Sequence, residues 1–157
     1  MAIDKGDTAA DFELPDQYGT ARKLSDLLAE GPVVLFFYPA AMTSGCTAES
    51  CHFRDLAAEF AAAGAQRVGI SRDAVDRQKQ FSDLHRFDYP LLSDVDSAVA
   101  AAFGVKRRLP LGPLSTRRMT FVIDTDRRVL DVIHSELGMN DHADRALETL
   151  RARNAQS

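Results

Sequence analysis

The sequence has few cysteines, no long hydrophobic run and no excess of basic residues. Its 157 residues include two cysteines and carry a net charge of −4, so it lacks the basic footprint typical of nucleic-acid binding. The longest apolar run, residues 32–42, is shorter than the about 20 residues that a transmembrane helix needs. The first residues lack the apolar core of a signal peptide. We therefore expect a cytoplasmic protein that binds neither nucleic acid nor membranes.

The two cysteines, Cys46 and Cys51, carry more information than their number suggests. In a chain without a leader they indicate a reducing compartment, where paired thiols are more often catalytic or metal-binding than structural. His52 beside Cys51 allows a metal site with both thiols, but the spacing matches no common zinc signature. We expect no metal and no cofactor.

The pattern of apolar residues predicts an α/β protein with a mixed sheet. A composition of 45% hydrophobic and 27% charged residues is ordinary for a globular protein, and the length suits one domain spanning residues 1–157. Predicted strands are residues 33–37, 66–71, 89–93, 119–124 and 128–134, after an N-terminal β-hairpin of residues 12–14 and 21–24. Predicted helices are residues 45–63, 74–86, 97–103 and one beginning after Asn140–Asp141. Two prolines and a glycine make residues 106–115 a predicted loop.

Some side chains are also assigned to a face or to solvent. In the helix of residues 74–86, Val75, Phe81 and Leu84 are expected to share one side. The closing helix is expected to turn four residues inward: Ala143, Ala146, Leu147 and Leu150. The remaining histidines are expected to be solvated or to cap helices: His85, His134 and His142.

Residues 33–51 combine a buried strand, a polar loop and a helix start. The run Val33–Phe37 is short and wholly apolar, which predicts a central strand buried on both faces. Thr43 and the two residues after it suit a helix start. Cys46 then falls in the first turn, where unpaired amides and the helix dipole favour the thiolate over the thiol. The pattern therefore predicts a nucleophilic cysteine.

Cys51 lies five residues after Cys46, a poor spacing for a disulfide within a helix. Positions five apart point about 140° away from each other, and their Cα atoms are about 8.7 Å apart. A disulfide needs a Cα separation of at most about 7 Å. Either the two thiols never pair, or this turn of helix unfolds locally during the working cycle.

The motif Pro39-x-x-x-Thr43-x-x-Cys46 resembles the active-site signature of the peroxiredoxins, which are thiol-dependent peroxide reductases. Residues 45–55, Gly-Cys-Thr-Ala-Glu-Ser-Cys-His-Phe-Arg-Asp, are similar to the bacterioferritin comigratory protein and peroxiredoxin Q branch. The resemblance continues in order through residues 11–19, 90–94, 103–105 and 118–124. The loop departs from it in three places: Ser44 replaces a usual proline, Met42 a common phenylalanine, and Ala40-Ala41 a pair that is often charged. These changes affect the loop lining rather than the reaction type.

The resemblance implies a thioredoxin-like fold, with a mixed central sheet flanked by helices, and a site of six residues: Pro39, Thr43, Cys46, Glu49, Cys51 and Arg118. Cys46 would attack the peroxide O–O bond and become a sulfenic acid. Cys51 would resolve it as an intramolecular disulfide, which thioredoxin or a similar dithiol would reduce. The branch also favours a monomer.

The other site residues have assigned roles with structural alternatives. Thr43 would contact the peroxide or the thiolate, or cap the helix. Pro39 would rigidify and shield the loop, or simply end the strand. Glu49 would orient the active-site arginine, or be a favourable acid in the first helical turn.

An arginine is needed because charge moves from sulfur to the departing oxygen as the O–O bond breaks. The chain offers Arg107, Arg108, Arg117 and Arg118. The resemblance selects Arg118, and side-chain alternation along a strand would point Arg117 to the opposite face.

Two other functions use the same features. A thioredoxin-like disulfide oxidoreductase would share the fold, although its reactive cysteines are normally three residues apart. A redox sensor would react without efficient peroxidase activity. The peroxidase interpretation predicts hydrogen peroxide and organic hydroperoxides as substrates.

Overall fold

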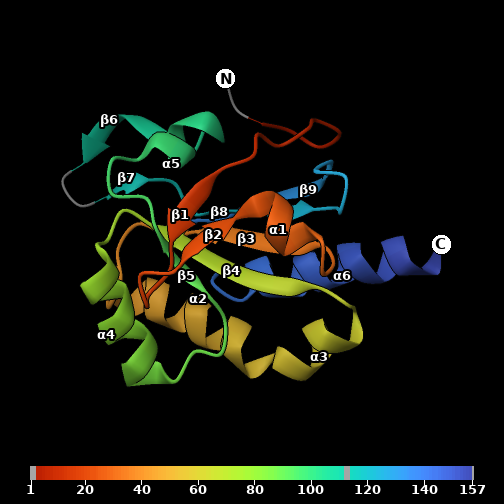
Figure 1. Cartoon of the computed structure of the whole chain (residues 1–157), viewed down its shortest axis with the longest axis horizontal. Helices are drawn as coiled ribbons and strands as arrows, with labels where there is room; N and C mark the ends of the chain where they lie inside the picture. The colour runs from red at the N-terminus through yellow and green to blue at the C-terminus, as the bar shows by residue number, and fades with distance from the viewer. Residues whose placement is uncertain (1–2, 112–113, 157) are drawn as a thin grey trace.

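A five-stranded mixed sheet forms the centre of the computed structural model, which describes residues 3–111 and 114–156, with side chains described for residues 3–106 and 116–156 (Figure 1). The strand order is β5 (Leu91–Ser93), β4 (Gln66–Ser71), β3 (Val33–Phe37), β8 (Met119–Ile123) and β9 (Val129–His134). The first three strands are parallel, whereas β8 runs antiparallel to β3 and β9 antiparallel to β8. The predicted mixed sheet is confirmed.

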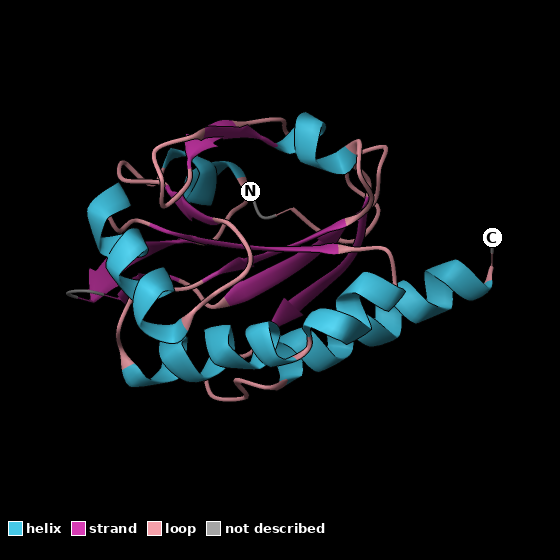
Figure 2. Cartoon of the chain, turned by 60° about the horizontal axis from the view of Figure 1, so that its bottom comes forward, coloured by secondary structure: helices cyan, strands magenta, loops and turns pink. Residues whose placement is uncertain are grey.

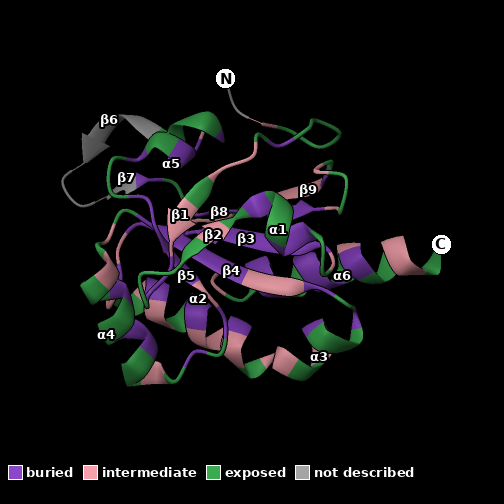
Figure 3. Ribbon diagram, in the orientation of Figure 1, coloured by how far each residue is buried: buried purple, intermediate pink, exposed green. Residues whose placement is uncertain are grey.

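Strand β3 lies in the middle of the sheet and is covered on both faces. Its five residues are at most 1% exposed. Val34 and Phe36 pack into one core and Val33, Leu35 and Phe37 into the other, as alternation along a strand requires. The loop that follows β3 therefore begins at a rigid, wholly buried strand (Figure 3).

Helices cover both faces of the sheet (Figure 2). The core on one face includes residues of α2 (Ser44–Asp55), α3 (Ala57–Ala62), α4 (Val75–His85) and α6 (Asp141–Ala155). The core on the other face includes residues of α1 (Leu24–Leu28) and α5 (Ala98–Ala102). The four residues expected to face inward from the closing helix are at most 4% exposed, which confirms that prediction. No helix in the described ranges is both long enough and apolar enough to cross a membrane.

Two small antiparallel ribbons flank the main sheet. The predicted N-terminal hairpin is confirmed as β1 (Glu13–Pro15) with β2 (Ala21–Lys23). The predicted loop at residues 106–115 was wrong, because β6 (Lys106–Leu111) pairs with β7 (Leu114–Thr116). A two-stranded ribbon consists of edge strands only, where the missing N–H of a proline such as Pro110 is tolerated.

The helix predicted for residues 45–63 is divided at Leu56, which has φ −96° and ψ 22°. Hydrogen bonds still run from Leu56 N–H to His52 O (3.2 Å) and from Phe60 N–H to Leu56 O (3.0 Å). The break is therefore a local change in backbone direction at Leu56, and the spacing of apolar residues does not predict such a break. At 15 residues, α6 is the longest helix in the described chain, against 12 for α2.

The predicted inward face of α4 was partly wrong. Phe81 is buried, but Leu84 is 67% exposed, and polar Gln78 is fully buried. The buried amide is satisfied because Gln78 donates to Ser71 Oγ (2.9 Å) and to Leu92 O (2.8 Å), and accepts from the Tyr38 hydroxyl (2.6 Å). Three hydrogen bonds let polar Gln78 lie in the core, whereas the predicted Leu84 lies at the surface.

The Phe36–Phe53 stack fixes α2 on the sheet and gives a stability prediction. The two rings lie 4.1 Å apart between centroids at 7°, and both side chains are fully buried. Phe53→Ala is expected to lower the free energy of unfolding by about 3–5 kcal/mol through lost burial and a cavity. Denaturant unfolding measures it, with exposed Leu84→Ala as the control. Equal effects of the two changes would contradict this packing.

Candidate active site

Cys46 lies where the chain passes from β3 into α2. Helix α2 begins at Ser44, so Cys46 is its third residue and lies in the first turn, as predicted. Its side chain is 1% exposed. The sulfur is therefore close to the unpaired amides at the helix start and is largely shielded from bulk water.

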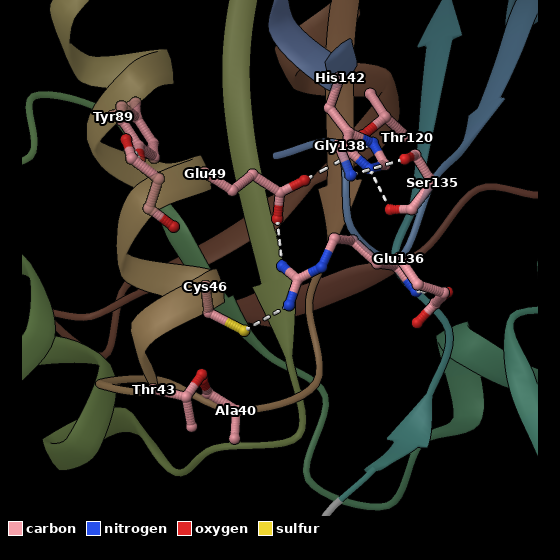
Figure 4. Close-up of polar contacts among 12 residues, drawn as sticks. Ala40, Thr43, Cys46, Glu49, Tyr89, Thr120, Ser135, Glu136, Gly138 and His142 are labelled. Carbon is pink, nitrogen blue, oxygen red and sulfur yellow. Dashed lines mark hydrogen bonds and ion pairs between the residues drawn. The ribbon is translucent and has the colours of Figure 1, made fainter. Parts of the chain in front are cut away.

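Arg118 brings a guanidinium to the Cys46 sulfur. It directly precedes β8, and only 6% of the residue is exposed. Its Nη2 lies 3.3 Å from Cys46 Sγ, and its Nη1 donates to Glu49 Oε1 at 2.8 Å (Figure 4). Glu49 is three residues after Cys46, which places both side chains on the same side of α2. The structure thus joins three of the six predicted site residues.

Of the other three candidate arginines, Arg117 is the one whose side chain the structure describes. Arg117 is exposed, as alternation along the strand predicts. The side chains of Arg107 and Arg108 lie outside the described residues.

The charges at Glu49 and Arg118 are strongly affected by burial. Burial raises the pKa of Glu49 to about 8, although the nearby Arg118 opposes that shift. Burial lowers the pKa of Arg118, but the charges of Glu49 and Cys46 outweigh it and the net shift is upward. Arg118 is therefore a permanent cation held between two acidic groups, available to stabilise negative charge on sulfur or on a bound oxygen.

Thr43 and Pro39 belong to the loop before Cys46. Thr43 occupies the N-cap position, but the expectation that its side chain caps the helix was wrong. Its hydroxyl instead donates to the Ala40 carbonyl at 2.9 Å, so the hydrogen is already used and the oxygen is left as an acceptor. Thr43 is exposed at the surface and Pro39 is buried. The loop is tied to its neighbour by Ala41 N–H, which donates to Asp73 Oδ2 at 2.7 Å.

Cys51 lies in the same helix as Cys46, and both thiols are free. Its side chain is half-buried and packs against the core on that face of the sheet. Burial raises the pKa of Cys51, which disfavours its thiolate in this position. The helix runs unbroken from Ser44 to Asp55, the arrangement in which two thiols five residues apart do not pair.

His142 is the residue that sequence reasoning missed. It was expected to be solvated or to cap a helix, but it is fully buried next to Glu49. Its Nδ1 lies 2.7 Å from Thr120 Oγ1, and its Nε2 lies 2.8 Å from the Ser135 carbonyl. Helical spacing carried the signal, because positions 142, 146 and 150 share one face and the other two were already assigned to the core.

The metal alternative involving His52 gains no support from the structure. His52 Nε2 lies 2.8 Å from Asp144 Oδ1 at the surface. Across residues 3–111 and 114–156, no cluster of three or more His, Cys, Asp or Glu side chains is arranged to hold a metal ion.

Comparisons with known proteins agree with the geometry of the site. The model of the AhpC/TSA family matches residues 5–132. The chain belongs to the peroxiredoxins. Peroxiredoxin Bcp of Bacillus subtilis is 36% identical over 154 residues, covering 96% of this chain and 97% of that protein.

Solved structures place the chain in the bacterioferritin comigratory protein and peroxiredoxin Q branch. The crystal structure of peroxidoxin BcpB from Mycobacterium tuberculosis superposes with a TM-score of 0.91 at 67% identity, covering 96% of this chain and 97% of that one. The bacterioferritin comigratory protein of Xanthomonas campestris gives 0.82 at 33% identity, covering 90% and 91%. The thioredoxin-like fold predicted from sequence is confirmed.

This peroxiredoxin is a thiol-dependent peroxidase. Its substrate is a peroxide, and a thiol compound or protein supplies the electrons. The alternative of a fold relative without efficient peroxidase activity is not supported by these comparisons.

Proposed function

We propose that Cys46 is the peroxidatic cysteine of this enzyme. Its thiolate attacks one peroxide oxygen, the O–O bond breaks, and the products are the Cys46 sulfenic acid and an alcohol or water after protonation of the departing oxygen. The sulfur loses two electrons and the peroxide gains them. The observation that carries the proposal is the 3.3 Å contact between Arg118 Nη2 and the Cys46 sulfur.

The other residues of the site prepare this step. Arg118 stabilises the thiolate and then the charge that develops on the departing oxygen, while Glu49 holds the guanidinium in place at 2.8 Å. Thr43 accepts a hydrogen bond from the peroxide, since its own hydrogen is directed to Ala40. Pro39 is buried, has no N–H, and rigidifies the start of the loop.

Cys51 resolves the sulfenic acid, and this second step requires motion. Its thiolate attacks Cys46 sulfur, a disulfide forms and water leaves. The first turn of α2 must unwind for the two sulfurs to meet. Unwinding also exposes the half-buried Cys51 to water, which removes the burial that raises its pKa. The same motion therefore brings the thiols together and activates the second one.

The surrounding assignments follow from this chemistry. Thioredoxin or a similar dithiol would reduce the Cys46–Cys51 disulfide by exchange. Hydrogen peroxide and organic hydroperoxides are the proposed substrates, in keeping with the alkyl peroxide reduction activity of the Xanthomonas campestris protein. We propose a monomer working in the cytoplasm, with residues 1–157 as one domain.

Replacing Arg118 tests the contact that carries the proposal. Arg118→Ala is expected to slow the reaction of the reduced protein with peroxide by about 10²–10³-fold, because one preorganised charged donor is lost. Arg117→Ala is the control, since it removes the same side chain from the neighbouring exposed position. Rapid mixing followed by mass analysis of the oxidised protein gives the rate. Equal rates for the two variants would rule out the proposed role of Arg118.

A further inference from the structure

The ring of His142 shows where one of its hydrogens lies. Its Nε2 is 2.8 Å from the Ser135 carbonyl oxygen, which only accepts, so Nε2 carries a hydrogen. Its Nδ1 faces Thr120 Oγ1 at 2.7 Å and Glu49 Oε2 at 3.5 Å. The side chains of His142 and Glu49 are both 0% exposed, so bulk water does not reach the contact between Nδ1 and Oε2.

The contact of 3.5 Å between Glu49 Oε2 and His142 Nδ1 is explained by one additional proton on the pair. If Glu49 were ionised and His142 neutral, Nδ1 would accept from the Thr120 hydroxyl at 2.7 Å, and Oε2 would face Nδ1 at 3.5 Å with no donor. In the part of the chain that the structure describes, Oε2 has no hydrogen-bond partner, although Oε1 is held by Arg118. A buried carboxylate oxygen without a donor is costly. A proton on Oε2 removes the unpaired buried charge, and a proton on Nδ1 supplies Oε2 with a donor.

We propose that Glu49 and His142 share a single proton while Cys46 is a thiolate, so that the pair is neutral and Arg118 serves the sulfur alone. The inference rests on the proposed role of Arg118 at Cys46. His142 is then a positioning residue: it never touches the peroxide, but it determines whether Glu49 competes with the thiolate for the guanidinium.

Charge balance favours this arrangement. The cluster is buried and contains one permanent cation, so it accommodates one negative charge better than two. Beyond Arg118 and Cys46, the groups that face the pair are acidic or neutral: Tyr89 before β5, Glu136 in the loop before α6, and Asp141 in α6. The nearby acids disfavour a second negative charge.

The direction of each pKa agrees with a proton held by the pair. Burial raises the pKa of Glu49 to about 8 and lowers the pKa of His142, so the carboxyl is the better holder of the proton. Below pH 8 the pair is neutral. As the pH rises through that value the proton leaves, a carboxylate forms 2.8 Å from Arg118 Nη1, and the thiolate loses part of its stabilisation. The peroxide reaction should therefore slow on the alkaline side.

Glu49→Gln tests this by imitating the neutral acid. The amide keeps an oxygen for Arg118 and gains an N–H for His142 Nδ1, but it has no proton to lose. Between about pH 7 and about pH 9 the parent rate with peroxide should fall up to about tenfold, because about nine tenths of the pairs lose the proton. The Glu49→Gln rate should not fall, and near pH 9 it should exceed the parent rate.

Glu136→Gln is the matched control. Glu136 Oε2 accepts from the backbone N–H of Arg118 at 3.0 Å, so this change removes a carboxylate close to Arg118 and leaves the buried pair intact. It should keep an alkaline fall, at a somewhat lower pH than in the parent, because Glu136 also raises the pKa of Glu49. His142→Asn is the second variant: an amide N–H facing Oε2 favours the carboxylate, so the fall should move to lower pH.

Several results would overturn the shared proton. They are a parent rate that stays level, a Glu49→Gln rate that falls with pH as the parent does, and a Glu49→Gln rate below the parent across the whole range. If circular dichroism shows that Glu49→Gln does not fold, His142→Asn is the deciding variant. An alkaline fall of its rate at the same pH as in the parent would also overturn the proposal. A fast Arg118→Ala variant would instead refute the proposed function, which keeps the two failures distinct.

Discussion

Cys46→Ser is expected to abolish peroxide reduction, with a loss of at least about 10⁴-fold, because the nucleophile itself is removed. A serine hydroxyl at this position has neither the acidity nor the nucleophilicity of a thiolate, and Arg118 at 3.3 Å does not compensate for either. Peroxide consumption in the presence of thioredoxin, thioredoxin reductase and their electron donor measures the effect.

The control for this variant is already in the chain. Serine and cysteine are nearly the same size, and Cys51→Ser makes the same replacement five residues further along α2. That variant retains the first reaction with peroxide, so a difference between the two assigns the nucleophile. Full turnover by Cys46→Ser would refute the assignment of Cys46.

Cys51→Ser is expected to complete one peroxide turnover and then stop. Cys46 still becomes a sulfenic acid, but no second thiol in the chain is present to displace its oxygen. The variant should consume about one peroxide per protein and gain the mass of one oxygen. Peroxide titration with mass measurement tests both statements.

Continued turnover by Cys51→Ser with thioredoxin would contradict this mechanism. It would mean that the external dithiol reduces the sulfenic acid directly and that α2 has no need to unwind. Cys51 would then be a packed core residue, as its half-buried position against neighbouring apolar side chains also allows.

The parts of the fold that the sequence predicts are those in which local pattern and tertiary environment agree. Val33–Phe37 is apolar at every position, and a central strand buried on both faces is the one place where such a run fits. Cys46 follows because the strand ends at a fixed point and a helix must start soon after it. The loop and helix start therefore position the cysteine almost independently of the rest of the chain.

The features that sequence did not predict depend on contacts between distant segments. Gln78 is buried because Tyr38, Ser71 and Leu92 happen to satisfy its amide. His142 lies 93 positions after Glu49, and nothing local to either residue indicates that they meet. Pattern reasoning assigns polar residues to solvent by default, so it fails where buried partners exist.

The choice of the active-site arginine also depended on more than local sequence pattern. Composition offered four candidates, and alternation alone separated Arg117 from Arg118 without saying which one faces the site. The family motif selected Arg118, and the structure places its guanidinium between Cys46 and Glu49.

The central claim is that an intact turn of helix opens once in each catalytic cycle so that Cys51 reaches Cys46. Its most direct test is the mass of the reduced parent protein after one equivalent of peroxide, with thiol-blocking reagent added before analysis. We predict a loss of two hydrogens and no blocked thiol, which identifies the Cys46–Cys51 disulfide. A gain of one oxygen with one thiol blocked would contradict the claim, because the sulfenic acid would then persist beside a free Cys51.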